Sequence, residues 1–296
     1  MTIYFITYGN DIYKEALIRI KKEANDFNIF DIIICYKIED LKNDTSFWNK
    51  HSSFISNNSR GNGYWIWKSY LIQKTLNIMK DEDILVYVDC GCELNNFYYY
   101  KMIEYFNMLK KNKFDILCTT TNFIEKDWNK KDLFIYLQLD NKKYTETEQL
   151  QAGIIILKKT NKIVNFINDW YYISCIYNLI DDSPSIEKNY SSFKEHRHDQ
   201  SIFSLLCKKK LTFYIISSYY FSPIIVSRNK SRYTTPSACG TFGATSCYYL
   251  QHIATFCFIV ITTCCIFIGL RYNLTAKVAR MSRKRREGGS GTSFTI

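Results

Sequence analysis

Residues 81–93 read Asp-Glu-Asp-Ile-Leu-Val-Tyr-Val-Asp-Cys-Gly-Cys-Glu. A polar turn leads into an apolar run at 84–88, which is long enough for one buried strand and decides the fold class. The run ends at Asp89, and Glu93 follows shortly after it. Ligands bind at the carboxyl ends of strands in open α/β sheets, and carboxylates there can hold a divalent cation and, through it, a diphosphate. The alternative interpretation is a strand followed by a solvated acidic turn.

Short apolar runs alternate with amphipathic segments through most of the chain. This alternation predicts an α/β fold in which helices flank a mostly parallel sheet with right-handed crossovers. The runs predicted to form strands are 3–8, 29–36, 84–88, 114–119, 151–157 and 213–217. The segments predicted to form helices are 11–27, 66–79, 97–111, 127–139, 160–180 and 201–207.

The composition limits the functional classes. The chain has 296 residues, of which 17% are aromatic, so most of it is globular rather than disordered. The formal net charge of +11 is uneven, because residues 231–296 hold eight Lys and Arg against one acidic residue. Subtracting these from 39 and 28 leaves 31 against 27 in residues 1–230, a net charge of only +4. The eleven cysteines lack metal-ligand spacing, which disfavours a zinc site.

The last part of the sequence differs from the rest. Asn is frequent in residues 1–230 but occurs once afterwards, at Asn273, so we expect an unrelated C-terminal tail after a domain at 1–230. Residues 231–252 are predicted to be a linker, and the uncharged run 253–270 a possible transmembrane segment. Residues 271–296 are predicted to be a basic, disordered tail. Because no signal peptide precedes the first strand, we expect a cytoplasmic protein, with membrane association through 253–270 as an open alternative.

Residues 60–68 read Arg-Gly-Asn-Gly-Tyr-Trp-Ile-Trp-Lys and form the first candidate site. Backbone N–H groups at such a glycine turn can meet a phosphate, and Arg60 and Lys68 add positive charge. Trp65 and Trp67 could stack on a base or a sugar ring. The alternative is a tight turn with two core tryptophans.

Two further motifs lie later in the chain. Gln151-Ala152-Gly153 opens a predicted strand, where a glycine permits close approach of the backbone. His198-Asp199-Gln200 opens a predicted helix. There His can bind a metal or a phosphate, and Asp can act as a base or orient a sugar hydroxyl. The alternative is capping of the helix by Asp199 beside an exposed histidine pair.

Taken in order, these motifs resemble a known family. The sequence is similar to small GT-A-fold glycosyltransferase-like proteins of giant viruses and bacterial polysaccharide loci, and the resemblance runs from about residue 3 to Lys230. The motifs that carry it are Arg60–Lys68, Asp83–Cys92, Ala152-Gly153 and His196–Ser201. The resemblance implies transfer of a sugar from a nucleotide-sugar donor to an acceptor hydroxyl of a glycan or a glycosylated protein, with no nucleic-acid partner.

The resemblance also implies roles for individual residues. Asp199 and His198 would be catalytic, with Asp199 as general base in an inverting enzyme or beside the donor sugar in a retaining one. Mn²⁺ or Mg²⁺ would be bound by Asp89, Glu93 and His198. Here the sequence departs from the family, because Gly91 stands where the Asp-x-Asp motif has its second Asp. The residues expected to bind the donor are Arg60, Gly61, Gly63, Trp65, Lys68, Asp89, Gly91, Ala152, Gly153 and Gln200.

Without a metal, Arg60 and Lys68 would have to neutralise the departing diphosphate. Two other functions stay open at this point. Gly91 permits a catalytically inactive GT-A-like domain. The many Lys and aromatic residues permit a nucleic-acid-binding module, although they are spread over several predicted helices rather than gathered in one stripe.

Overall fold

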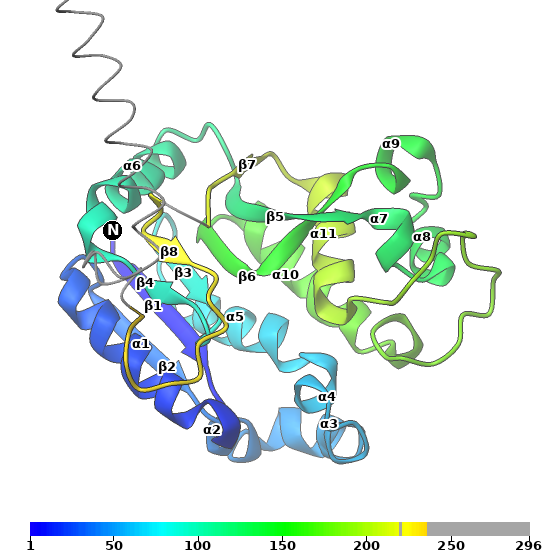
Figure 1. Cartoon of the computed structure of the whole chain (residues 1–296), viewed down its shortest axis with the longest axis horizontal. Helices are drawn as coiled ribbons and strands as arrows, with labels where there is room; N and C mark the ends of the chain where they lie inside the picture. The colour runs from blue at the N-terminus through cyan, green and yellow to red at the C-terminus, as the bar shows by residue number, and fades with distance from the viewer. Residues whose placement is uncertain (219–220, 236–296) are drawn as a thin grey trace, which may run out of the picture. The chain divides into compact units, whose positions relative to one another are not determined.

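The computed structural model describes residues 1–218 and 221–235 (Figure 1). Its centre is a six-stranded sheet in the order β2-β1-β3-β6-β5-β7. β6 runs antiparallel to both of its neighbours, whereas the other paired strands are parallel. The predicted α/β fold with a mostly parallel sheet is therefore confirmed. The strands are β1 (Ile3–Tyr8), β2 (Ile32–Tyr36), β3 (Ile84–Val88), β5 (Ile116–Ile124), β6 (Glu148–Lys158) and β7 (Phe213–Ile215).

Helices connect the strands, and a second, two-stranded sheet pairs β4 (Glu93–Leu94) with β8 (Ile224–Ile225). The α-helices are α1 (Lys14–Phe27), α2 (Ile38–Lys42), α3 (Thr45–Asn57), α4 (Gly61–Tyr64), α5 (Trp67–Ile78), α6 (Tyr99–Lys110), α7 (Glu125–Trp128), α8 (Lys131–Tyr136), α9 (Lys142–Thr145), α10 (Asn161–Ser174) and α11 (His198–Lys210). The 3₁₀ helices are η1 (Asp11–Tyr13), η2 (Asn96–Tyr98) and η3 (Tyr177–Leu179).

Two predicted helices are interrupted. The segment 160–180 is helical only as α10 and the separate η3. The segment 127–139 was expected to be continuous, but the structure divides it between α7 and α8. Asn129 has extended backbone angles, φ −130° and ψ 138°, and its side-chain amide donates to the Glu125 carbonyl at 2.9 Å. Asn competes in this way for local backbone groups, which favours a break over a helical turn.

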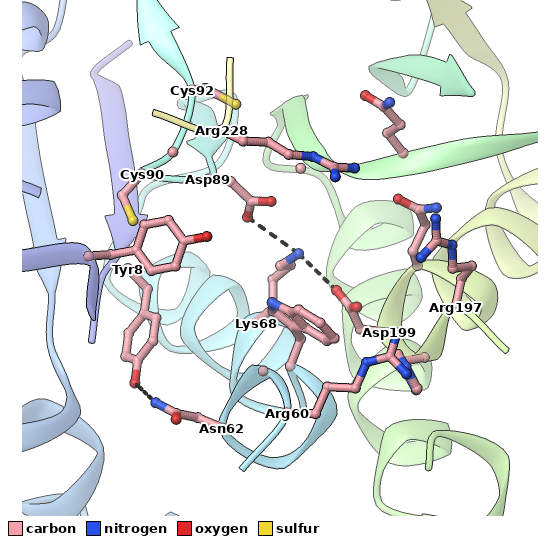
Figure 2. A pocket seen from close by; sticks show the side chains of 18 of the residues that line it. Tyr8, Arg60, Asn62, Lys68, Asp89, Cys90, Cys92, Arg197, Asp199 and Arg228 are labelled. Atoms are coloured by element: carbon pink, nitrogen blue, oxygen red, sulfur yellow. Dashed lines mark hydrogen bonds and ion pairs between the residues drawn. The ribbon is translucent and has the colours of Figure 1, made fainter. Parts of the chain in front are cut away.

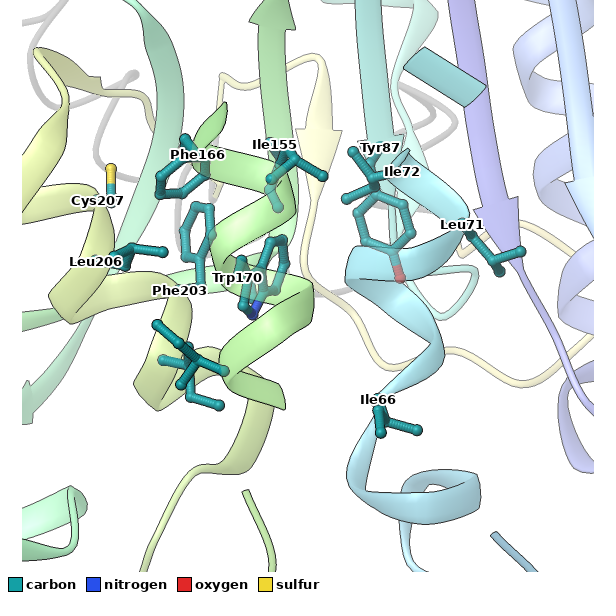
Figure 3. Close-up of a cluster of buried hydrophobic side chains, with 14 of the residues drawn as sticks. Ile66, Leu71, Ile72, Tyr87, Ile155, Phe166, Trp170, Phe203, Leu206 and Cys207 are labelled. Atoms are coloured by element: carbon teal, nitrogen blue, oxygen red, sulfur yellow. The ribbon is translucent and has the colours of Figure 1, made fainter. Parts of the chain in front are cut away.

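The two faces of β3 explain why this strand is entirely apolar. Ile84, Val86 and Val88 pack in one core with residues of α1 and α6. Leu85 and Tyr87 pack on the other face, in a core that includes residues of α5, α10 and α11. Figure 3 shows this second core, where side chains of the three helices meet Tyr87 and Ile155 of the sheet. A strand buried on both faces needs apolar residues at every position.

Because β6 is antiparallel, its first half lies beside the carboxyl end of β3. Val88 pairs with Ile154, and the Asp89 N–H donates to the Gly153 carbonyl at 2.8 Å. The motifs that end β3 and begin β6 thus meet at one edge of the sheet.

The domain continues beyond its predicted end at Lys230. Arg19 of α1 donates to the carbonyl oxygens of Asn229 and Ser231, and Thr234 donates to Glu23 of α1. Residues 231–235 therefore pack on the domain and do not begin a linker. The rest of the predicted linker, the run 253–270 and the basic tail lie outside the described residues. Within the described part of the chain, no helix is both long and apolar enough for a membrane span.

Candidate active site

A pocket of about 780 Å³ opens at the carboxyl edge of β1 and β3 (Figure 2). It is lined by residues from seven separate segments of the chain. These are Tyr8–Tyr13, Ser59–Lys68, Asp89–Cys92, Thr121–Phe123, Gln151 with Gly153, Arg197–Gln200, and Val226–Lys230. The volume lies within the range of small-ligand sites in proteins.

The centre of the pocket is a lysine between two carboxylates. The Lys68 ammonium lies 2.9 Å from Oδ2 of Asp199 and 3.4 Å from Oδ1 of Asp89. Lys68 and Asp199 are 3% and 4% exposed, whereas Asp89 is only half-buried. Tyr87 also donates its hydroxyl to Oδ1 of Asp89 at 2.5 Å. Lys68 is the second residue of α5 and Asp199 the second residue of α11, so the first turns of two helices position this pair.

Burial governs the ionisation of the central groups. Desolvation raises the pKa of Asp199 to about 6, and the nearby Asp89 charge adds to this effect, while Lys68 opposes it. The pKa of Lys68 is also raised, because its two carboxylate partners outweigh its desolvation. The pair is thus charged at neutral pH, yet Asp199 can take up a proton close to neutrality.

Gly153 and Ala152 are neighbours in β6 that face opposite sides of the sheet. A Cβ atom on Gly153 would lie 2.9 Å from Oδ2 of Asp89, so only glycine leaves this carboxylate undisturbed. Ala152 points the other way and is fully buried in the core. Gly153 therefore lines the pocket, whereas Ala152 does not.

The turn before α5 has a different structure from the one expected. Backbone φ is positive from Gly61 to Trp65, and the Gly61 carbonyl accepts from Nε1 of Trp67 at 2.9 Å. The N–H groups of residues 62–65 all donate to carbonyl oxygens within the segment 58–61. They are therefore not available to a phosphate, which corrects the expectation of a backbone phosphate site. Gly63 is buried against Ile55 and lies outside the pocket.

Arg60 and His198 both line the pocket, and each already has partners within the fold. Arg60 pairs with Asp182 at 3.3 Å and with Glu195, so its charge is already balanced. The His198 ring stacks on Tyr64 and Trp65, and its Nδ1 lies 2.8 Å from the Ile180 carbonyl oxygen. Because a carbonyl only accepts, Nδ1 carries the proton. Burial lowers the pKa of His198 to about 4, so the ring is neutral.

Glu93 is the clearest difference from the sequence-based expectation. It is fully buried, and it accepts hydrogen bonds from Asn229 and from the N–H and hydroxyl of Thr235, the latter two at 3.0 and 2.6 Å. It does not line the pocket. Among the described residues no group of three or more His, Cys, Asp or Glu side chains could hold a metal ion. The predicted ligand set of Asp89, Glu93 and His198 is not assembled, and the residues present do not fit a divalent cation.

The remaining predicted site residues are brought together in the pocket. They are Arg60, Gly61, Trp65, Lys68, Asp89, Gly91, Gly153, His198, Asp199 and Gln200. Several lining residues were not predicted, including Tyr8, Asn62, Arg197, Arg228 and Lys230. One signal was present in the sequence: residues 1–230 contain 27 lysines but only four arginines. Three of those arginines line this pocket.

No protein-family model and no curated protein matches the sequence. Among solved structures, mouse xyloside xylosyltransferase 1 is 11% identical, with a TM-score of 0.41 over 73% of this chain and 86% of that one. A glycosyltransferase involved in glycosylation of the major capsid of PBCV-1 is 10% identical, with a TM-score of 0.41 over 74% and 84%. The galactosyltransferase LgtC is 12% identical, with a TM-score of 0.36 over 79% and 85%.

Proposed function

We propose that this chain is a GT-A-like glycosyltransferase, which transfers a sugar from a nucleotide-sugar donor to a hydroxyl of a glycan or of a glycosylated protein. One observation carries the proposal. The buried carboxylate of Asp199 lies in a pocket that is otherwise rich in cationic side chains. Such a pocket offers a base for a hydroxyl beside a cationic environment for a diphosphate.

The charge balance of the lining supports an anionic ligand. Five cationic and two acidic side chains line the pocket; because Asp182 and Glu195 already balance Arg60, the other four cations leave a net charge of +2 with His198 neutral. The cationic residues are Arg60, Lys68, Arg197, Arg228 and Lys230, and the acidic ones are Asp89 and Asp199. The lining also includes the aromatic side chains of Tyr8, Tyr13 and Trp65, on which a base or a sugar ring can stack. A sugar linked to a nucleoside diphosphate combines these properties.

The proposed step moves one glycosyl group. The acceptor oxygen attacks the anomeric carbon of the donor, and its proton passes to the Asp199 carboxylate. The bond between the anomeric carbon and the phosphate oxygen breaks, and its electron pair leaves with the nucleoside diphosphate. Because the pKa of Asp199 is about 6, the group is ionised at neutral pH and is still basic enough to accept this proton. This role belongs to an inverting transfer.

The decisive experiment is a transfer assay with a panel of UDP- and GDP-sugars, using the full chain. Asp199→Asn should lower turnover about 10²–10⁴-fold with the fold intact, the range for positioned acid–base catalysis. Asp169→Asn is the matched control, because Asp169 is exposed on α10 and pairs with Lys210 away from the pocket. Near-wild-type transfer by Asp199→Asn would remove Asp199 from the mechanism. Donor binding by the wild type without turnover of any donor would instead indicate an inactive domain.

A further inference from the structure

We infer that the pocket binds the diphosphate of its ligand without a divalent cation, in a cradle of Lys68, Arg197 and Arg228. This inference rests on the proposed function and deepens it. A metal-dependent pocket would need free carboxylates at the end of β3. Here the Lys68 ammonium already lies between Asp89 and Asp199, at 3.4 and 2.9 Å.

A divalent cation shared by the two carboxylates would have to displace this buried ammonium. Removing one partner of a buried ion pair leaves the other charge uncompensated, which is strongly unfavourable. Oδ1 of Asp89 also accepts the Tyr87 hydroxyl. The third candidate ligand, Glu93, has its oxygens bonded to Asn229 and Thr235 outside the pocket.

The pocket contains a cationic group without an acidic partner in the described structure, Arg228, and one with only a long ion pair, Arg197. Arg228 is part of the lining, and within the described residues its guanidinium has no ion pair or hydrogen bond. Nε of Arg197 is buried and is likewise without a hydrogen-bond partner in the described structure. The Arg197 side chain lies 3.6 Å from Glu195, too far for a hydrogen bond, and packs on Phe123 and Trp128.

The guanidinium groups also approach one another. Figure 2 shows Arg60, Arg197 and Arg228 around the Lys68–Asp199 pair, each on a different segment. Burial lowers the pKa of Arg197, and the charges of Arg60 and Arg228 add to this effect, while Glu195 opposes it. Like charges held together in this way are unfavourable until an anion joins them. Guanidinium groups bind phosphate oxygens in a bidentate manner, which suits a diphosphate.

Glu93 stabilises the segment that carries Arg228 through hydrogen bonds outside the pocket. It binds Asn229, the residue next to Arg228, and Thr235 at the end of the described chain. Arg19, the one arginine of residues 1–230 outside the pocket lining, donates to the carbonyl oxygens of Asn229 and Ser231 at 2.9 and 2.8 Å. We call residues 226–235 the strap. A carboxylate predicted to bind a metal thus positions the strap that carries Arg228.

Calorimetric titration of the full chain with UDP and with GDP, in EDTA and in MnCl₂, tests the inference. We expect the better of the two nucleotides to bind with dissociation constants that agree within about twofold between the two conditions. Arg228→Gln should weaken binding about 10- to 100-fold in EDTA, the loss of charge-assisted hydrogen bonds. Arg232→Gln is the matched control, because Arg232 is an exposed strap residue that pairs with Glu15. Thermal melting checks that both variants fold.

The outcomes separate the cradle from the proposed activity. Binding that requires Mn²⁺ and disappears in EDTA would overturn the metal-independent cradle and leave the proposed transfer standing. Wild-type affinity in Arg228→Gln would also overturn it. Binding in EDTA with no transfer from any UDP- or GDP-sugar would refute the proposed function and leave the cradle. No binding of either nucleotide in either condition would refute both.

Discussion

The Lys68 ammonium lies 2.9 Å from Oδ2 of Asp199, and both side chains are almost completely buried. Burial alone would neutralise either group, so each keeps its charge largely because of the other. Asp89 completes the trio from the more open side of the pocket. Lys68 therefore has two effects: it occupies the space between the carboxylates, and it limits how far the pKa of Asp199 rises.

The first prediction concerns the pH dependence of transfer. Asp199 must be deprotonated to act as a base, so kcat/KM should rise with pH through an apparent pKa of about 6 and then level off. Lys68→Gln should move this limb to higher pH, because the ammonium lowers the pKa of Asp199. Asp89→Asn should move it to lower pH, because the Asp89 charge raises that pKa. A pH–rate profile of each variant gives the apparent pKa independently of the maximal rate. If the apparent pKa of the profile were the same in both variants, the titrating group would not be Asp199.

A second prediction follows from the contact between Gly153 and Asp89. A Cβ atom at residue 153 would lie 2.9 Å from Oδ2 of Asp89, so Gly153→Ala should push this carboxylate out of position. We expect transfer to fall about 10- to 100-fold, the scale of a misplaced site group, while the melting temperature is maintained because Ala costs less conformational entropy than Gly in a strand interior. Gly91→Ala is the control: its nearest atom, in Tyr13, is 3.4 Å away, an ordinary contact. Equal activity of the two variants would contradict the steric argument.

A third prediction tests the support of the strap by Glu93. A glutamine can accept only through its single carbonyl oxygen, so Glu93→Gln loses part of the hydrogen bonding to Asn229 and Thr235. A looser strap should raise KM for the donor about tenfold with little change in kcat, since Glu93 is outside the pocket. Steady-state kinetics separate the two parameters. The exposed Glu104→Gln on α6 serves as control. A fall in kcat with KM unchanged would place Glu93 in the chemical step instead.

Local sequence patterns predicted the sheet, and they singled out residues that the fold brings into one pocket. A few neighbouring residues were enough to predict each of three features: the strand that ends at Asp89, the strand that contains Gly153, and the start of α11. The strap could not be predicted in this way. β4 and β8 have two residues each and no periodicity, and they pair residues such as Glu93 and Ile225 that are far apart in the sequence.

The prediction that Glu93 binds a metal was wrong for the same reason: the side chain is placed by a pairing between distant residues. Successive residues of a strand point to opposite faces, so the direction of Glu93 depends on a pairing that only the folded chain reveals. The internal hydrogen bonds of the glycine turn at residues 58–65 likewise depend on its exact backbone angles. The scarcity of arginine was the one usable signal for Arg197 and Arg228, because arginine suits bidentate recognition of phosphate better than lysine does.

The last prediction concerns stability in acid. The described part of the chain contains three buried histidines, His51, His196 and His198. Burial lowers the pKa of His51 and His198 to about 4, and it lowers that of His196 well below its ordinary value. All three are neutral in the folded state and take up protons near pH 6.5 only when the chain unfolds. Their contribution to stability is therefore complete above pH 6.5 and is lost as the pH falls towards 4.

Each buried histidine lowers the free energy of unfolding by up to about 1.4 kcal/mol per pH unit as the pH falls through this range. Below pH 6 the raised pKa of Asp199 has the opposite effect and offsets the contribution of one histidine. Denaturant unfolding between pH 7.5 and 5 should therefore show a falling free energy of unfolding. His51→Gln should have a shallower slope, because glutamine does not titrate and can still donate to and accept from the Tyr171 and Tyr177 hydroxyls that flank His51. The comparison uses the slope, so a change in overall stability does not affect it. An unchanged slope in His51→Gln would show that His51 is already protonated in the folded chain.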